Sequence, residues 1–441
     1  MFLNHCRTNG SSTRLGKSGD ELTRLNALIR KSSGTECDLC AVTGTGSQAN
    51  QHAVMNATGG KMTSCMIAVG SYLSGDESWF SQLSTSTYDL KNGPAAIKEP
   101  TSVQPELAAQ IAPLPCYIPG GFYEKSLLDH YENQVLLNLH TTCLVRKVKG
   151  EPVRALLLEL ILCGNGAVLS DRALAIIGLL AKQHNFHIIV DEIMTGGRIA
   201  SSEQSKMLHL LSKPKEFQEV VAHVTFGKWL DNGVVVVKNS LKSELVPVLD
   251  TYRGVPTHHN LGTTVSNWET VAATDLQVFR DRRSKVLKTL KLRDDEAWGE
   301  GLLIFGPVER NDSKPALQSR FLPTLDDTKI DTFTRHRNKE WTRKKINNVV
   351  VHGVMKWVHH GSTQSGDHGM HSLLLGFLKE RRLPNFFNKN NIVDAFGQGQ
   401  SERMVSNLLG AAVKKEILCA KQVGSKRVRS WALTTHSLPP F

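Results

Sequence analysis

Short runs of apolar residues recur along the first two thirds of the chain, separated by polar or glycine-containing segments. Runs of this kind, rich in Val, Ile and Leu, predict buried strands. We expect strands at residues 65–69, 154–158, 186–190, 220–225 and 234–237. The segment 92–119 is rich in Pro, Gly and Ser, and it is expected to be a loop or an excursion from the domain.

Between these runs, apolar residues recur every three or four positions, which is the spacing of one face of a helix. This spacing predicts helices over residues 21–29 and 48–57. A further helix is expected after Ser170, because serine is a common cap at helix N-termini. Near 263–278 we expect a loop that enters a helix, followed by the basic stretch 280–291.

Strands that alternate with helices in this way predict an α/β domain with a mostly parallel sheet. The pattern changes near residue 290, where continuous apolar runs become fewer and His and Trp become more frequent. We therefore expect a short N-terminal segment at 1–40, a large domain at 41–285 and a smaller α+β domain at 286–441.

Composition narrows the class of protein. No stretch reaches the ~20 apolar residues of a spanning helix, which predicts a soluble protein. The eight cysteines are scattered, as expected for reduced thiols inside a cell, and residues 1–15 lack the apolar core of a secretory signal. We expect an intracellular protein, cytoplasmic rather than mitochondrial. The net charge of +12 would attract anions of any kind, including phosphorylated cofactors and nucleic acid.

A glycine-containing turn opens the predicted helix at 48–57, in the order Thr45-Gly46-Ser47-Gln48-Ala49-Asn50. The N-terminus of a helix offers backbone N–H groups and the positive end of the helix dipole, which together can bind a phosphate. The alternative interpretation is an ordinary helix capped by a serine. The turn alone does not decide between the two.

Two charged residues stand at the ends of predicted strands. Asp191 follows an apolar strand, where a buried carboxylate needs a cation such as a protonated ring nitrogen, a metal ion or a salt-bridge partner. Lys228 lies between two predicted strands and is flanked by Gly227 and Gly233. A partly desolvated lysine can form an imine with a carbonyl group, although most lysines are solvated surface residues.

Two other clusters are weaker candidates for a metal or redox site. Cys37 and Cys40 form one Cys-x-x-Cys pair, but no second pair follows at zinc spacing. Near the C-terminus, histidines are close in sequence, but nearby glycines oppose a helix and the spacing matches no metallohydrolase motif. These histidines are His359, His360, His368 and His371. We expect no metal.

Six segments occur in an order that resembles the class III aminotransferases, which depend on pyridoxal phosphate. They are Gly46-Ser-Gln-Ala-Asn50, Gly70-Ser-Tyr72, Glu159-Leu-Ile-x-x-Gly-Asn-Gly166, Asp191-Glu-Ile-Met-Thr-Gly-Gly-Arg198, Thr225-Phe-Gly-Lys228 and Gly262-Thr-Thr-Val-Ser-Asn267. The segment at Asp191 is similar to the glutamate-semialdehyde aminomutase branch, and the whole resemblance covers about residues 40–282.

This resemblance implies fold type I of the pyridoxal-phosphate enzymes, with a small-molecule amino donor and an oxo acceptor as substrates. Lys228 would form the Schiff base with the cofactor, and Asp191 would keep its ring nitrogen protonated. The other cofactor contacts that the resemblance implies are Gly46, Ser47, Tyr72, Glu159, Ile193, Met194 and, across the interface of a homodimer, Thr263.

The sequence also departs from the family. Leu73, Leu160 and Trp268 replace a characteristic His and two prolines, and only about 40 residues precede the phosphate turn. These departures keep open a pyridoxal-phosphate aminomutase and a non-catalytic or impaired relative that retains the cofactor. A nucleic-acid-binding protein is a remote alternative, since no nucleic-acid motif accompanies the basic stretch at 335–345.

Overall fold

A computed structural model describes a large part of the chain. It comprises residues 14–34, 36–68, 88–89, 93–94, 110–121, 125–162, 166–199, 202–203, 205–244, 258–289, 292–306, 318–320, 343–344, 347–348, 350–351, 354–355, 418–422 and 429–433.

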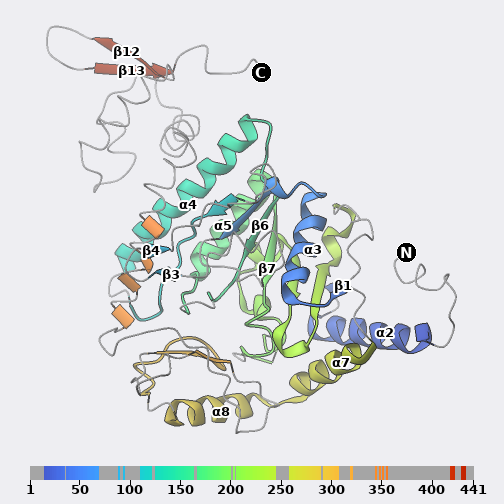
Figure 1. Cartoon of the computed structure of the whole chain (residues 1–441). Helices are drawn as coiled ribbons and strands as arrows, with labels where there is room; N and C mark the ends of the chain where they lie inside the picture. Colours follow the sequence, from blue (N-terminus) through green and yellow to red (C-terminus); the bar gives the residue numbers. More distant parts are fainter. Residues whose placement is uncertain are drawn as a thin grey trace.

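A seven-stranded sheet lies at the centre of the molecule (Figure 1), with the strand order β1-β9-β8-β7-β6-β2-β5. Strand β9 runs antiparallel to both of its neighbours, whereas β8, β7, β6, β2 and β5 run parallel to one another. The strands are β1 (Cys37–Thr43), β2 (Cys65–Ala68), β5 (Gln110–Ala112), β6 (Ala155–Leu158), β7 (His187–Asp191), β8 (Val221–Phe226) and β9 (Gly233–Lys238). The predicted α/β class with a mostly parallel sheet is confirmed.

Helices cover both faces of this sheet (Figure 1). The long helices are α2 (Arg14–Ser32), α3 (Gly46–Thr58), α4 (Lys125–Val148), α5 (Asp171–His184), α7 (His258–Ala273) and α8 (Leu276–Thr289). Short helical turns are η1 (Met62–Ser64), η4 (His209–Ser212), α6 (Lys215–Gln218), η5 (Lys228–Leu230) and η6 (Asn239–Glu244). None of the helices in the described part is long and apolar enough to cross a membrane.

In the described part of the chain, three small two-stranded sheets lie outside the central sheet. They pair β3 (Tyr88–Asp89) with β4 (Gly93–Pro94), β10 (Leu303–Phe305) with β11 (Gln318–Arg320), and β12 (Leu418–Gln422) with β13 (Arg429–Leu433). Strands β4 and β5 fall within residues 92–119, so the expectation of a loop or excursion there was wrong for the residues of these two strands. The division of the chain into domains stays a prediction.

Alternate residues of each strand contribute to two separate cores, because successive side chains of a strand point to opposite faces. On one face, Leu157 and Ile189 pack with Ala53 and Val54 of α3. On the other face, a larger core joins the remaining strand residues to α5, α7 and α2. Burial on both faces explains why the strands appear in the sequence as continuous apolar runs.

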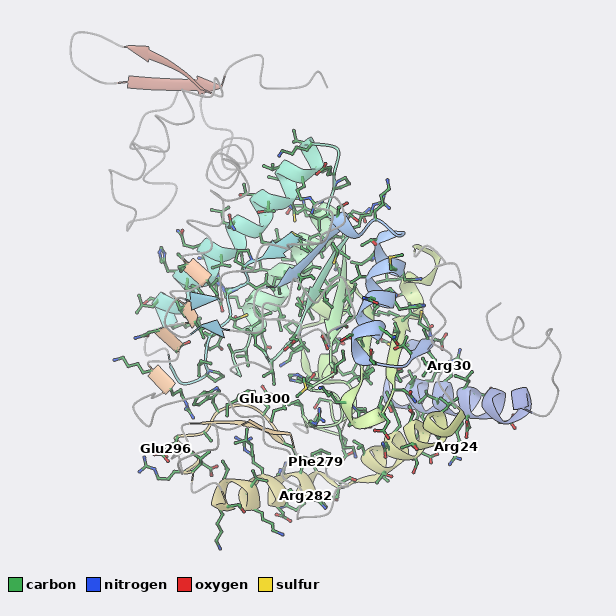
Figure 2. All side chains as sticks on the ribbon, in the orientation of Figure 1. Arg24, Arg30, Phe279, Arg282, Glu296 and Glu300 are labelled. Atoms are coloured by element: carbon green, nitrogen blue, oxygen red, sulfur yellow. The ribbon has the colours of Figure 1, made fainter. Side chains whose placement is uncertain are left out.

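Helices α2 and α7 pack side by side beneath the sheet (Figure 2), and this pair supports the site described below. Arg24 of α2 donates two hydrogen bonds to the Glu269 carboxylate of α7, at 2.7 and 2.8 Å. The indole Nε1 of buried Trp268 donates to Ser32 Oγ at 3.2 Å. The exposed Arg24–Glu269 ion pair contributes at most about 1 kcal/mol to the packing of α2 against α7, so burial of Trp268 stabilises this packing more.

The N-terminal boundary of α5 is the one that the sequence predicted. Ser170 Oγ accepts a hydrogen bond from the backbone N–H of Ala173 at 3.0 Å, so Ser170 is the N-cap. Helix α7, in contrast, begins at His258, and the expected loop at Thr263 was wrong. Gly262 and two threonines disfavour a helix intrinsically, but packing of the buried face of α7 overrides that preference.

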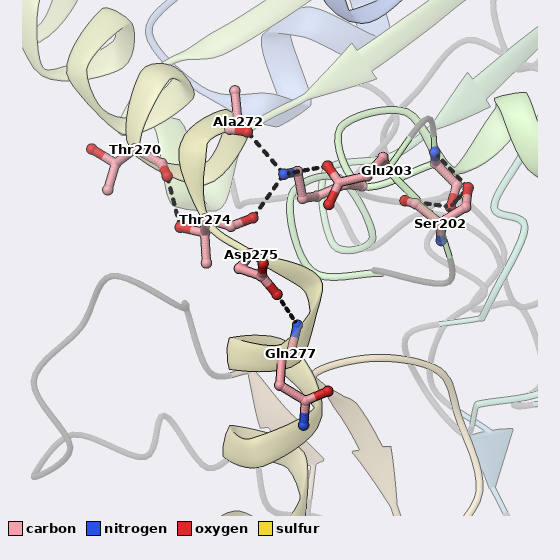
Figure 3. A network of polar contacts seen from close by, with 9 residues as sticks. Ser202, Glu203, Thr270, Ala272, Thr274, Asp275 and Gln277 are labelled. Carbon is pink, nitrogen blue, oxygen red and sulfur yellow. Dashed lines mark hydrogen bonds and ion pairs between the residues drawn. The ribbon is translucent and has the colours of Figure 1, made fainter.

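A buried lysine explains why α7 ends where it does (Figure 3). Lys206 Nζ donates to the backbone carbonyls of Ala272 and Thr274, at 2.8 and 2.7 Å, and to Glu203 Oε2 at 2.8 Å. The last carbonyls of a helix lack partners within the helix, and a cation is favoured beside them. Asp275 Oδ1 then accepts from the Gln277 backbone N–H at 2.6 Å, at the start of α8.

Candidate active site

Three segments that are far apart in the sequence touch beside the carboxyl ends of β7 and β8. A β-carbon built on Gly46 would lie 2.7 Å from Ile193 Cδ1, and one on Gly227 would lie 3.2 Å from both Gly46 Cα and Ile193 Cγ2. Since ordinary contacts of a β-carbon exceed about 3.4 Å, only glycine allows this approach at Gly46. The fold therefore brings together the turn at Gly46, the strand end at Asp191 and the loop that carries Lys228.

The turn before α3 has a complete N-terminal cap. Thr45 Oγ1 accepts from the Gln48 backbone N–H at 3.2 Å, and Gln48 Oε1 accepts from the Gly44 backbone N–H at 2.9 Å. The helix begins at Gly46, so Gly46 and Ser47 provide its first two backbone amides. First-turn amides have no acceptors within their own helix and favour an anion nearby. The assignment of Gly46 and Ser47 to a phosphate stays a prediction.

Gly46→Val is expected to weaken binding of a phosphorylated cofactor at least about tenfold, because the new side chain would displace Ile193 and fill the approach to the helix N-terminus. A titration of the variant with pyridoxal phosphate, followed by absorption, measures this change. Gly19→Ala is the matched control, since a β-carbon at Gly19 of α2 meets nothing within 4 Å. Unchanged affinity in Gly46→Val would contradict the predicted role of the turn.

Asp191 ends β7 with its side chain only 5% exposed. Its Oδ1 accepts from the Ile193 backbone N–H at 2.9 Å, and its Oδ2 accepts from Asn50 Nδ2 at 2.7 Å. Burial raises the pKa of Asp191 to about 6, although both hydrogen bonds and the charge of Lys228 act in the opposite direction. A carboxylate buried in this way is stabilised by a cationic group that reaches it.

Lys228 follows Gly227 directly and begins the turn η5, with an exposed side chain. Its backbone φ is +49°, a left-handed conformation that lysine seldom adopts. Helix α7 holds this turn in place from below: Thr264 Oγ1 donates to the Leu230 carbonyl at 2.7 Å, and Asn267 Nδ2 donates to the Trp229 carbonyl at 2.8 Å. Such external anchors are what allow an unfavourable backbone conformation to persist.

Glu159 and Met194, two other predicted contacts, lie next to this centre. Leu158 pairs with Val190 in the sheet, so Glu159 and Asp191 are the next residues along neighbouring parallel strands. Glu159 is buried. The pKa of the Cys116 thiol is raised to about 12, mainly by burial of the thiol and also by the charge of Glu159. Met194 is also buried, and its carbonyl accepts from Arg198 Nη1 at 2.9 Å. Their roles toward a cofactor stay predictions.

Two predicted contacts are not brought to the centre by the described residues. Tyr72 lies outside the part of the chain that the structure describes. Thr263 is exposed on α7, and its predicted contact belongs to a second subunit. The candidate metal ligands His359, His360, His368 and His371 also lie outside the described part.

The cysteine pair does not have the environment of a reactive site. Cys37 and Cys40 both lie in β1, and burial raises the pKa of the Cys37 thiol to about 11. A reactive thiol needs the opposite shift, toward the thiolate. Within the described ranges, no group of three or more His, Cys, Asp or Glu side chains could hold a metal ion.

Glu192 has a structural role next to Asp191. Its two carboxylate oxygens accept from the backbone N–H groups of His209 and Leu210, at 2.9 and 2.8 Å. Complete burial raises its pKa to about 7. Glu192 therefore fastens the segment at 209–210 to the end of β7.

A scan against protein-family models and a search of curated proteins found no match to this chain. Solved structures do resemble it. A lysine aminotransferase from Mycobacterium tuberculosis is 13% identical with a TM-score of 0.48, covering 80% of this chain and 83% of its own. An (S)-enantioselective omega-transaminase from Thermomicrobium roseum is 15% identical with a TM-score of 0.47, covering 81% and 84%.

Proposed function

We propose that this chain binds pyridoxal 5'-phosphate and transfers an amino group between a small-molecule amino donor and an oxo acceptor. The observation that carries the proposal is the contact of Gly46 with both Ile193 and Gly227. Through it, a helix N-terminus, a buried carboxylate and a lysine loop share one neighbourhood, as the sequence resemblance requires.

The chemistry of the described residues fits the parts of this cofactor. Its phosphate is an anion, which suits the helix N-terminus at Gly46 and Ser47. Its protonated ring nitrogen is a cation, which suits the buried carboxylate of Asp191. Its aldehyde reacts with a primary amine, which Lys228 provides. The Ile193 side chain, between the two glycines, offers an apolar contact for the ring.

When bound, pyridoxal phosphate supplies an electron-withdrawing ring that makes the Cα–H bond of an attached amine acidic. The protein supplies the groups that position the ring and move the proton. The Asp191 carboxylate retains the proton of the ring nitrogen, and each pKa unit of that effect corresponds to about 1.4 kcal/mol. The Lys228 amine would act first as the base that takes the proton from Cα and then as the acid that delivers it to the cofactor, which is the proton shift that amino-group transfer requires.

The proposed assembly is a homodimer in which Thr263 of each subunit contacts the phosphate bound by the other. Thr263 is exposed on α7, which is compatible with such a contact. If the contact exists, cofactor binding and dimerisation must strengthen each other. Sedimentation is expected to show a tighter dimer with cofactor than without it, and Thr263→Val should remove that difference. A monomer that binds the cofactor fully would exclude this arrangement.

An absorption titration of the purified protein tests the function directly. Pyridoxal phosphate should produce a visible band, and borohydride reduction should leave the mass of the cofactor on the peptide that contains Lys228. Addition of amino donors with a 2-oxo acid should then give amine-dependent turnover. A cofactor band without turnover would favour the non-catalytic alternative, and no binding at all would refute the proposal.

A further inference from the structure

Two buried side chains, Asn50 and Thr225, connect Asp191 to helix α3 and to strand β8. Asn50 Nδ2 donates to Asp191 Oδ2 at 2.7 Å, and Thr225 Oγ1 donates to Asn50 Oδ1 at 2.5 Å. Both Asn50 and Thr225 are completely buried. The sequence motifs contain both residues without indicating what either one does.

The direction of these hydrogen bonds determines how the amide of Asn50 is oriented. A carboxylate can only accept hydrogen bonds, so the amide must present its NH₂ group to Asp191. Its oxygen then faces Thr225, whose hydroxyl is the donor that a buried carbonyl oxygen requires. The reversed amide would leave Asp191 without this donor.

The two residues also join the three parts of the site. Asn50 lies in α3, one turn after the N-terminus at Gly46. Thr225 pairs with Asp191 across the parallel strands β7 and β8 and precedes Lys228 by three residues. A chain of two hydrogen bonds therefore fixes the carboxylate relative to both the helix turn and the lysine loop.

The charges around the carboxylate explain why a donor is needed there. Burial raises the pKa of Asp191, whereas the hydrogen bonds from Ile193 and Asn50 and the charge of Lys228 lower it. The charge of Asp191 in turn helps to raise the pKa of the adjacent Glu192, whose own burial has the larger effect. The Asn50 donor thus favours the ionised carboxylate, which is the form that holds a ring N–H.

We infer that Asn50 is a positioning residue for Asp191, and that Thr225 sets the orientation of the Asn50 amide so that the carboxylate is aimed at the ring nitrogen of the cofactor. This inference rests on the proposed function. It differs from a purely structural role because its effect depends on the nitrogen atom of the ligand.

The experiment compares two ligands. One is pyridoxal phosphate, and the other is its analogue with CH in place of the ring nitrogen. In Asn50→Leu, the affinity for pyridoxal phosphate divided by the affinity for the analogue should fall about tenfold or more. The variant removes a hydrogen bond that stabilises the Asp191 carboxylate, and only pyridoxal phosphate has a ring N–H for that carboxylate to bind. Affinity for the analogue should not fall, since it offers no N–H to Asp191. Both affinities are measured by equilibrium titration, independently of turnover.

Asn56→Leu is the matched control on the same helix. Asn56 Oδ1 contacts His223 Nε2 at 2.9 Å, so this variant also removes a buried amide contact, but one away from Asp191. The affinity ratio should stay within about twofold of wild type, even though stability falls in both variants. An equal fall of the ratio in Asn56→Leu, or an unchanged ratio in folded Asn50→Leu, would overturn the inference.

Thr225 provides a second test that does not depend on the folding of Asn50→Leu. Thr225→Val keeps the shape but removes the hydroxyl, so the affinity ratio should fall several-fold. Thr225→Ser keeps the hydroxyl and should restore the ratio, and an equal ratio in Val and Ser variants would overturn the role of Thr225. A wild-type protein that binds no pyridoxal phosphate would refute the proposed function itself, whereas binding with an unaltered ratio refutes only this inference.

Discussion

Lys228→Ala is expected to abolish covalent attachment of pyridoxal phosphate and to reduce amine-dependent turnover by at least about a thousandfold. Lys228 is assigned two roles, the attachment of the cofactor and the movement of the Cα proton, and alanine performs neither. Borohydride reduction followed by peptide mass analysis measures the attachment, and an amine-dependent assay measures turnover.

Two further variants separate the charge of Lys228 from its chemistry. Lys228→Arg retains a cation near Asp191, but its guanidinium cannot form the covalent bond. It should therefore be as inactive as Lys228→Ala while retaining more of the non-covalent cofactor affinity. Lys182→Ala changes an exposed lysine of α5 and should leave both readouts unaffected. Substantial turnover in Lys228→Ala would refute the assignment of this lysine.

Asp191→Asn is expected to lower turnover about a hundredfold or more while the cofactor remains attached to Lys228. Loss of the carboxylate lowers the pKa of the ring nitrogen, and two pKa units correspond to roughly that factor. Attachment persists because it does not require the ring proton. The Asn50 amide can reverse to accept a hydrogen bond from the new asparagine, and Thr225 can then donate or accept as needed. Near-normal turnover would mean that Asp191 is only a structural acid.

The same variant has a pH-dependent effect on stability before any cofactor is added. Burial raises the pKa of Asp191 from its ordinary 3.8 to about 6, so the folded protein binds this proton more tightly than the unfolded chain does. The contribution of Asp191 to stability is therefore fully present below about pH 4 and is lost as the pH rises through about 6. The difference in unfolding free energy between wild type and Asp191→Asn should change within this window and be constant above it.

Strands β2, β6, β7, β8 and β9 were predictable because each one is buried on both faces and appears as an apolar run, as in the valine-rich β9. Strand β1 was not, because its sequence mixes Asp38 with cysteines and small residues. Helix α4 was also missed, since polar residues such as Glu132, Asn138 and His140 are buried along it and obscure the helical pattern. Burial of polar groups depends on partners elsewhere in the chain, which local periodicity does not reveal.

Some residues of the site were predictable from local sequence, and others were not. Asp191 stood out because a carboxylate at the end of an apolar run requires a partner. Lys228 stood out because it lies between two strands, flanked by glycines, where a partly desolvated lysine can form an imine. The roles of Asn50 and Thr225 could not be inferred locally, because their contacts join positions 141 and 175 residues apart. The left-handed backbone of Lys228 was likewise invisible, since α7 imposes it through Thr264 and Asn267.

The antiparallel direction of β9 has a consequence for how the site assembles during folding. Because β9 returns directly beside β8, the loop at 227–232 that carries Lys228 belongs to a hairpin, which closes through contacts local in sequence. The hydrogen bond from Asn50 to Asp191 instead requires α3 to dock on the sheet across more than a hundred residues of chain. We therefore expect the β8–β9 hairpin to pair early, and the anchoring of its loop by α7 and the hydrogen bonds of Asp191 to form late. Cofactor added during refolding would then bind and stabilise only the fully assembled sheet, and no folding intermediate that precedes it.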